Sequence, residues 1–250
     1  MTYKRKVQIG DCTLYHGDSL EVMPTLDKVD CVVTDPPYLL TSGGNGEYAN
    51  WQLANDYKND GRIVLCDIGW ADFMPPISDV LKVGNHCYVM CNNRHVQEML
   101  TQAEAAGLSY HNLLVWDKKS CTPNRYYMKN LEYVGFFYKT HSKHLNNCSS
   151  QQLMACPQEN YGGHPTTKPT ALMLYYIENS TLPNDVVLDP FMGVASTGVA
   201  CVKSKRKFIG IELDENYFNI ACERIEKAYQ QPDLFIEAPK SAEQISIDNL

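Results

Sequence analysis

The chain has 250 residues, 44% of them hydrophobic and 20% charged, and a formal net charge of −7. This length suits one sizeable α/β domain, and the absence of any apolar run of membrane-spanning length argues against an integral membrane protein. The acidic balance is unfavourable for binding nucleic acid, so contact with phosphates would need a local basic face. The basic residues that offer one gather between residues 117 and 144.

Apolar runs and helix-like stretches alternate along the chain. The pattern predicts strands near 12–16, 29–34, 62–66, 86–91, 112–116, 133–138, 185–188 and 208–212. It predicts helices near 19–25, 70–82, 94–106, 168–179, 196–204 and 215–230. This alternation is typical of a mostly parallel, twisted sheet with helices on both faces, so the predicted fold class is α/β.

The pattern is compatible with a single domain over residues 1–230. Residues 39–61 are rich in glycine and asparagine, which predicts a mobile loop. Residues 139–163 are polar and lack a clear periodicity. Residues 231–250 form a polar tail that contains two prolines, and we expect it to be poorly ordered.

Ten cysteines are many for a chain of this length, but they do not form paired C-x-x-C clusters. Cys31, Cys87 and Cys201 fall inside apolar strand or helix patterns, which predicts reduced core thiols of a cytoplasmic protein. Cys87 and Cys91 lie near two histidines, but no second paired cluster accompanies them. We therefore expect no metal site.

Asp35-Pro36-Pro37-Tyr38 follows directly on the predicted strand 29–34. The exocyclic amine of a nucleobase is a poor nucleophile because its lone pair is delocalised into the ring. The Asp35 carboxylate and the Pro36 carbonyl can accept its two N–H groups and draw the nitrogen toward an attacking geometry, while the prolines fix the backbone. Tyr38 offers a ring on which an extruded base can stack. The same four residues also suit an ordinary turn at a strand end.

A second strand-turn-helix arrangement follows the apolar run 186–188. Its turn and helix start carry Asp189, Phe191, Gly193, Ser196 and Thr197. This is the layout of a nucleotide-type cofactor loop. Glu212 ends the next predicted strand, where a carboxylate suits the two ribose hydroxyls of an adenosine group. The loop lacks the G-x-G-x-x-G pattern, so the turn alone also fits an ordinary strand-to-helix connection.

Several blocks in one order resemble the S-adenosylmethionine-dependent DNA amino-methyltransferases of the N6-adenine/N4-cytosine type. The order is that of the permuted beta class, in which D-P-P-Y precedes the cofactor block. The matching blocks are Tyr15-His16-Gly17-Asp18, Asp35-Pro36-Pro37-Tyr38, Leu113-Leu114-Val115-Trp116-Asp117-Lys118, Leu131-Glu132-Tyr133, His164-Pro165-Thr166-Thr167-Lys168-Pro169, Asp189-Pro190-Phe191-Met192-Gly193 and Ile209-Gly210-Ile211-Glu212-Leu213-Asp214. The resemblance spans roughly residues 10–228.

The resemblance implies a Rossmann-like methyltransferase domain with S-adenosylmethionine as cofactor and no metal. It assigns catalysis to Asp35, Pro36, Pro37 and Tyr38. It assigns cofactor binding to Asp18, Asp35, Thr167, Lys168, Asp189, Phe191, Gly193, Ser196, Thr197, Glu212 and Leu213. Within this set, it implies that Asp18 holds the adenine, and Lys168 is a candidate partner for the cofactor carboxylate.

The expected substrate is double-stranded DNA with the target base flipped out, and no membrane is involved. A leading Asp in the motif is usual in adenine enzymes, so the resemblance favours adenine N6 over cytosine N4. Target recognition falls to the short segment 139–163, to the loop 39–61 or to a second subunit in a homodimer. Methylation of RNA stays open. So does a catalytically silent binding subunit, because Val194-Ala195 departs from the glycine-rich loop of the family.

Overall fold

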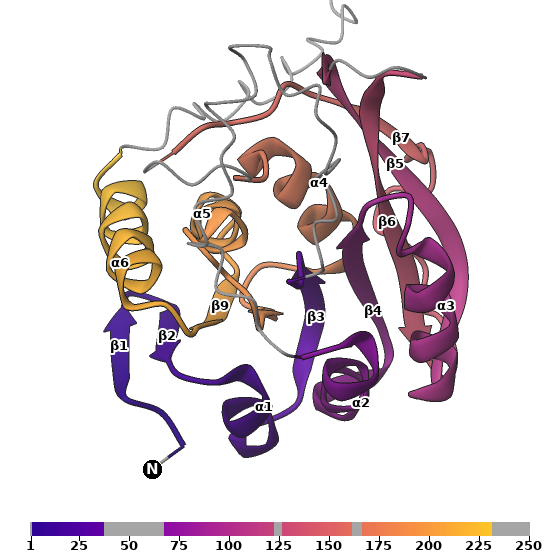
Figure 1. Cartoon of the computed structure of the whole chain (residues 1–250). Coiled ribbons are helices and arrows are strands. Elements are labelled where there is room, and N and C mark those ends of the chain that lie inside the picture. Colours follow the sequence, from indigo (N-terminus) through magenta and orange to yellow (C-terminus); the bar gives the residue numbers. More distant parts are fainter. Residues whose placement is uncertain (1, 38–67, 123–126, 162–166, 232–250) are drawn as a thin grey trace, which may run out of the picture.

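The computed structural model describes residues 2–37, 68–122, 127–161 and 167–231 (Figure 1). Within these ranges nine strands form one sheet, in the order β1-β2-β9-β8-β3-β4-β6-β5-β7. The strands are β1 (Arg5–Ile9), β2 (Cys12–His16), β3 (Val29–Thr34), β4 (Leu81–Cys91), β5 (Leu108–Thr122), β6 (Lys129–Lys139), β7 (Leu153–Ala155), β8 (Val186–Asp189) and β9 (Lys207–Glu212).

The five strands β2, β9, β8, β3 and β4 are mutually parallel, whereas β1 and β6 run antiparallel to their neighbours. The chain leaves β3 toward β4 and leaves β8 in the opposite direction, toward β9. The strand order therefore reverses between β3 and β8. In open α/β sheets, ligands bind outside the carboxyl ends of the strands at such a switch point.

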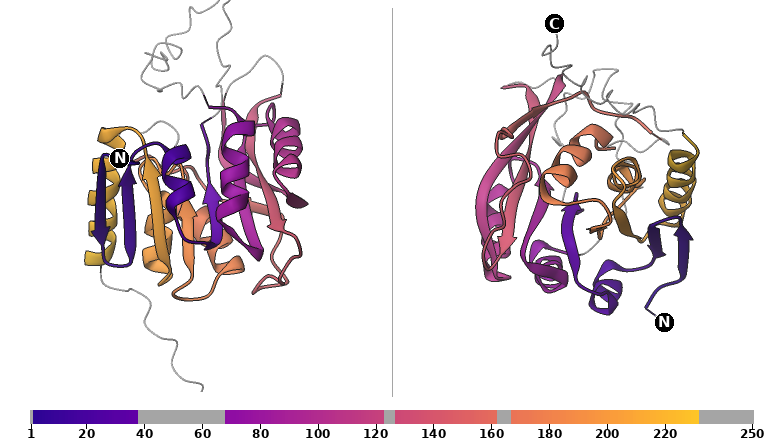
Figure 2. Two further views of the ribbon diagram at one scale, coloured as in Figure 1. Left: turned by 90° about the horizontal axis from the view of Figure 1, so that it is seen from below. Right: turned by 180° about the vertical axis from the view of Figure 1, so that it is seen from behind.

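Helices cover both faces of the sheet (Figure 2). One face carries α1 (Ser19–Val22), the 3₁₀ turn η1 (Met23–Thr25), α2 (Trp70–Val80) and α3 (Val96–Ala105). The other face carries α4 (Thr170–Ser180), α5 (Ser196–Lys203) and α6 (Glu215–Gln230). Each layer buries its apolar side against the sheet.

Alternation along the strands divides the apolar side chains between two cores. Cys31 and Val33 of β3 point into the core under α4–α6, while Val32 between them points into the core under α1–α3. A stack of Phe136, Tyr88 and Tyr176 fills the first core, with centroid distances of 4.9 Å and 4.8 Å. Burial on both faces explains why the central strands are continuous apolar runs.

The predicted α/β class and its parallel centre are confirmed. Two edge elements, β1 and β7, were not predicted, because β1 mixes charged with apolar residues and β7 has three residues. β4 begins at Leu81, earlier than the predicted 86. The predicted strand 62–66, the predicted mobile loop 39–61 and the tail beyond residue 231 lie outside the described residues.

Cys31, Cys87 and Cys201 are buried free thiols, as the apolar pattern around them predicted. Among the described residues, no group of three or more histidine, cysteine, aspartate or glutamate side chains has an arrangement that could hold a metal ion. The helices in these same ranges are all too short or too polar to cross a membrane.

Candidate active site

Four carboxylates meet at the carboxyl edge of the sheet. Asp35 follows β3 directly, Asp189 ends β8 and Glu212 ends β9. Asp18 comes two residues after β2, whose last residue pairs with Glu212. These residues are far apart in sequence, and parallel strand pairing brings them to one edge. The site predicted from the sequence is therefore assembled at the switch point of the sheet.

Asp35 presents one occupied and one open oxygen. Its Oδ2 accepts a hydrogen bond from Lys168 Nζ, whereas its Oδ1 is buried and receives no hydrogen bond from the described part of the chain. Burial raises the pKa of Asp35 above its usual range, the ammonium of Lys168 opposes this rise, and the nearby Glu132 carboxylate adds to it. Pro36 is buried and Pro37 half-buried behind it, and Tyr38 lies outside the described residues.

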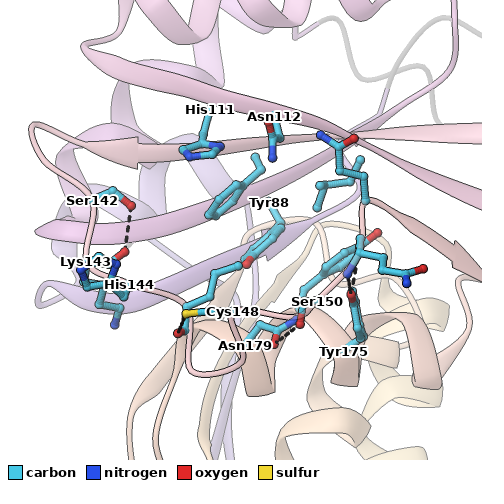
Figure 3. Close-up of a pocket in the computed structure, with 16 residues that line it drawn as sticks. Tyr88, His111, Asn112, Ser142, Lys143, His144, Cys148, Ser150, Tyr175 and Asn179 are labelled. Atoms are coloured by element: carbon cyan, nitrogen blue, oxygen red, sulfur yellow. Dashed lines mark hydrogen bonds between the residues drawn. The ribbon is translucent and has the colours of Figure 1, made fainter.

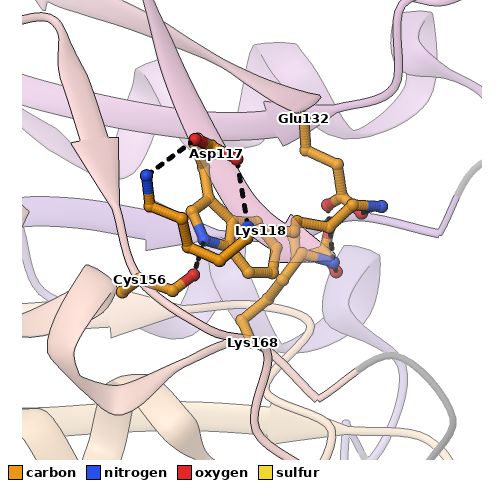
Figure 4. Close-up of polar contacts among 8 residues, drawn as sticks. Asp117, Lys118, Glu132, Cys156 and Lys168 are labelled. Carbon is orange, nitrogen blue, oxygen red and sulfur yellow. Dashed lines mark hydrogen bonds and ion pairs between the residues drawn. The ribbon is translucent and has the colours of Figure 1, made fainter. Parts of the chain in front are cut away.

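Glu132 of β6 lies next to the ion pair of Asp35 and Lys168. It falls within a block that resembles the family, but it was not predicted to be a site residue. Its Oε2 is 3.5 Å from Lys168 Nζ, and its Oε1 is 3.3 Å from Lys118 Nζ (Figure 4). Burial by itself would raise the pKa of Glu132, but the two ammonium groups outweigh burial and hold the pKa below its usual range. Asp35, Glu132 and the two lysines thus form a network of balanced charge.

Asp189 ties three elements together. It is 4% exposed and accepts hydrogen bonds from Thr34 Oγ1 at 2.8 Å, Thr197 Oγ1 at 2.7 Å and Phe191 N at 3.2 Å. Burial raises the pKa of Asp189 to about 6, against the opposing effect of these donors. The Asp189 carboxylate at the end of β8 is thereby hydrogen-bonded to the end of β3 and to the start of α5. Direct contact of Asp189 and Thr197 with a cofactor stays a prediction.

Glu212 organises the loop after β8. Its Oε2 accepts from Gly193 N at 2.9 Å and its Oε1 from Asp214 N at 2.8 Å. Burial raises the pKa of Glu212 to about 7, and the backbone donors oppose the rise. Gly193 has a φ of 50°, which favours glycine. A carboxylate oxygen can accept more than one hydrogen bond, so Glu212 retains capacity for ribose hydroxyls.

The other residues predicted to bind the cofactor surround this loop. Phe191 is half-buried, with its ring edge-on to Phe73 at 5.3 Å. Asp18 caps α1 through Leu20 N at 2.8 Å, and the exposed Leu213 meets the His16 ring through its carbonyl at 3.2 Å. Carboxylates on neighbouring strands, an aromatic ring and a glycine turn suit an adenosine group.

The departure from the family's glycine loop is accommodated in the interior. Val194 and Ala195 are buried, and Ala195 adopts a left-handed conformation with a φ of 59°. Arg224 of α6 donates to the Val194 carbonyl at 3.1 Å and to Ser196 Oγ at 3.0 Å. The side chains at 194 and 195 therefore fill the core, and Ser196 faces Arg224. The sequence analysis missed Arg224 as the anchor of this loop.

Thr167 and Lys168 lead into α4 and are both buried. Arg224 reaches this region too, because its Nη2 is 3.3 Å from Thr170 Oγ1 and 3.4 Å from Glu159 Oε2. Glu159 Oε1 in turn accepts from Thr170 N at 2.9 Å. These contacts connect the start of α4, which Lys168 precedes by two residues, to the loop before α5.

Residues 139–161 run from the amino ends of the central strands toward their carboxyl ends. Lys143 N donates to the Gly84 carbonyl at 3.0 Å, near the start of β4 and opposite the carboxyl edge of the sheet. The chain then returns along β5, where the Cys156 carbonyl accepts from Trp116 Nε1 at 2.9 Å. The later residues of this segment pair with β5, where Leu153 to Ala155 lie beside Val115 to Asp117. A recognition role for 139–163 stays a prediction.

A pocket of about 400 Å³ lies under the early part of that segment (Figure 3). Tyr88, Tyr176 and His111 contribute to its walls, together with Lys143 and other residues of the segment 142–152. None of the residues predicted for catalysis or cofactor binding lines it. The pocket is therefore separate from the carboxyl-edge site.

Comparison with known proteins places the chain among methyltransferases. The model of the DNA methylase family matches residues 29–223. The type II methyltransferase M2.LlaDCHI of Lactococcus lactis subsp. cremoris is 27% identical over 250 residues, covering 86% of this chain and 89% of that protein. The DNA adenine methyltransferase YhdJ of Escherichia coli K12 is 25% identical over 256 residues, covering 86% and 83%. The crystal structure of the M1.HpyAVI–SAM complex matches with a TM-score of 0.67 and 26% identity, covering 85% of this chain and 99% of that one.

Proposed function

The chain belongs to the DNA methylase family, and we propose that it methylates N6 of adenine in double-stranded DNA with Asp35 as the catalytic carboxylate. The observation that carries this proposal is the buried Asp35 Oδ1, which has no hydrogen-bond donor in the described chain. A buried acceptor without a donor is costly, so a substrate N–H is the partner that suits it. An exocyclic amine supplies that N–H.

Asp35 acts by electrostatics and orientation. Its Oδ1 accepts one N–H of the amine and the Pro36 carbonyl accepts the other, so the nitrogen lone pair is directed away from the ring. Positive charge that develops on the nitrogen is stabilised by the carboxylate, to which the proton can then pass. When bound, S-adenosylmethionine supplies an electrophilic methyl group. The target base leaves the duplex to reach Asp35, and Tyr38 is the residue proposed to stack on it.

Glu212 and Asp18 are proposed to hold the adenosine part of the cofactor. Their carboxylates lie at the ends of neighbouring strands, where they can accept from hydroxyl and amine donors. Phe191 offers a ring edge beside the Gly193 turn. The same pattern of acceptors at a strand-to-helix turn is common in nucleotide sites.

Adenine is favoured over cytosine by the leading Asp and by the similarity to a protein described as a DNA adenine methyltransferase. Cytosine N4 is the second candidate, since its amine has the same chemistry. The departure at Val194 and Ala195 was the basis for considering a catalytically silent subunit. Because both side chains are packed in the interior, this departure does not favour that alternative. A second subunit that contributes to target recognition stays a prediction.

Transfer of labelled methyl groups tests the proposal. Purified protein is incubated with methyl-labelled S-adenosylmethionine and either double-stranded DNA or RNA of matching sequence, and the digested nucleosides are separated. Label in N6-methyldeoxyadenosine supports the proposal, and label in N4-methyldeoxycytidine or in RNA assigns a different substrate. No label, together with no cofactor binding by calorimetry, would favour the silent subunit.

Cofactor affinity is expected to depend on pH through Glu212. With a pKa of about 7 in the free protein, Glu212 is largely protonated at pH 6, whereas ribose hydroxyl donors favour its charged form. The dissociation constant should therefore be about tenfold higher at pH 6 than at pH 8. Calorimetry on wild type and Glu212→Gln measures this. The cofactor's own amine titrates equally in both proteins, so an identical pH dependence in the variant would rule out Glu212 as the cause.

A further inference from the structure

We propose that Glu132 is a positioning residue that draws the ammonium of Lys168 away from Asp35 when the target amine binds. The inference rests on the proposed function, because it concerns how Asp35 becomes free to act on an amine. Three observations support it: the contact that Asp35 makes now, the open acceptor on Glu132, and the charge that Lys118 maintains there.

The present contact of Asp35 is unsuited to the reaction. Lys168 Nζ lies on Asp35 Oδ2, so the carboxylate is already neutralised by a buried cation. Methyl transfer builds positive charge on the amine nitrogen bound at the other oxygen. A second cation beside it would oppose that charge, and the opposition is strong in a site with little water. Asp35 stabilises the transition state best when the ammonium has another partner.

Glu132 is an alternative partner that the Lys168 ammonium can reach by a small displacement. Its Oε2 is buried and accepts no hydrogen bond from the described residues, although Lys168 Nζ is only 3.5 Å away. Charge-assisted N–H···O contacts are about 2.8 Å long, so a small displacement of the Lys168 side chain would complete the bond. The ammonium thus lies between two carboxylates, one holding it and one open to it.

Lys118 keeps Glu132 ready to receive the charge. It contacts the other oxygen, Oε1, at 3.3 Å, and with Lys168 it holds the pKa of Glu132 below its usual range. Among the described residues, Asp189 and Cys91 are further titratable groups that interact electrostatically with Asp35. Burial raises the pKa of the Cys91 thiol to about 12, so it stays neutral. Glu132 is therefore a charged acceptor that competes with Asp35 for Lys168.

The test is the pH profile of the single-turnover rate at saturating DNA and cofactor. We expect Glu132→Gln to lower the plateau by about 10- to 100-fold, because the ammonium then stays on Asp35. The acid limb should also move to lower pH, since the negative charge of Glu132 raises the pKa of Asp35. A packing defect lowers a plateau without moving the limb in this direction.

Asp30→Asn is the matched control. Asp30 is a carboxylate near the start of β3, the strand that Asp35 follows, and it is paired with Lys82 at 2.7 Å. Its replacement removes the same charge from an ion pair far from the catalytic edge and should leave the acid limb in place. An unchanged plateau in Glu132→Gln, or a lower plateau with an unmoved limb, would overturn the proposal.

A double-mutant cycle with Lys168→Met makes the test specific. If Glu132 acts by drawing the ammonium away, the Glu132→Gln substitution should change the rate less than twofold once the ammonium is gone. An equal loss in both backgrounds would overturn the role. Failure of the proposed function would be seen in a different measurement. In that case the wild-type protein would methylate no adenine in DNA, whatever the effect of substitutions at residue 132.

Discussion

Asp35→Ala is expected to slow methyl transfer by about 10³-fold in a single turnover, while S-adenosylmethionine still binds. Loss of one preorganised group aimed at developing charge has an effect of about this size in other enzymes. Asp35 Oδ1 is a buried acceptor without a hydrogen-bond donor in the described chain, and its Oδ2 accepts from Lys168. Rapid-quench measurement of the labelled product gives the rate, and calorimetry gives the cofactor affinity.

Asp35→Asn is the informative companion to this variant. An amide oxygen can still accept an N–H from the substrate, but it carries no charge to oppose the charge on nitrogen. We expect a rate between those of wild type and Asp35→Ala, with no acid limb from residue 35. Equal loss of cofactor binding and methyl transfer in Asp35→Ala would contradict a catalytic role and indicate collapse of the site.

Asp189→Ala is expected to lower the free energy of unfolding by several kcal/mol, because a buried donor left without its acceptor costs about 1–3 kcal/mol. The substitution leaves the Thr34 and Thr197 hydroxyls and the Phe191 N–H without their acceptor in the interior. Denaturant unfolding monitored by circular dichroism measures the change.

Asp189→Asn separates shape from charge at the same position. The amide keeps the volume and one acceptor oxygen, so it should cost less stability than alanine. Because burial raises the pKa of Asp189 to about 6, the neutral isostere also avoids burying a charge at neutral pH. A loss below about 1 kcal/mol in Asp189→Ala would show that the carboxylate does not hold β3, β8 and α5 together.

The sequence alone was sufficient to predict the carboxyl edge of the sheet. Apolar runs that end in Asp35, Asp189 and Glu212 place those residues together once the strands pair in parallel. Glu132 and Arg224 were not predictable, because their roles depend on partners far along the chain. Glu132 meets Lys168 only after β6 pairs with β4, and Arg224 meets Val194 only when α6 packs on α5.

The path of the segment predicted for target recognition, 139–163, could likewise not be predicted from the sequence. Its polar composition suggests an exposed stretch but contains no information on its path, which begins beside Gly84 at the edge opposite Asp35. The backbone hydrogen bonds and the Trp116–Cys156 contact that fix this path are tertiary features. A short periodic element can be read from local sequence, whereas an irregular segment is positioned by its surroundings.

The most direct test of methylation at Asp35 is nucleoside mass spectrometry of DNA from a methylation-deficient bacterial host that expresses the chain, beside the same host expressing Asp35→Ala. We expect N6-methyldeoxyadenosine in the first DNA and none in the second. N4-methyldeoxycytidine in place of the adenine product would contradict the base assignment. N6-methyldeoxyadenosine at equal levels in both strains would contradict the role of Asp35.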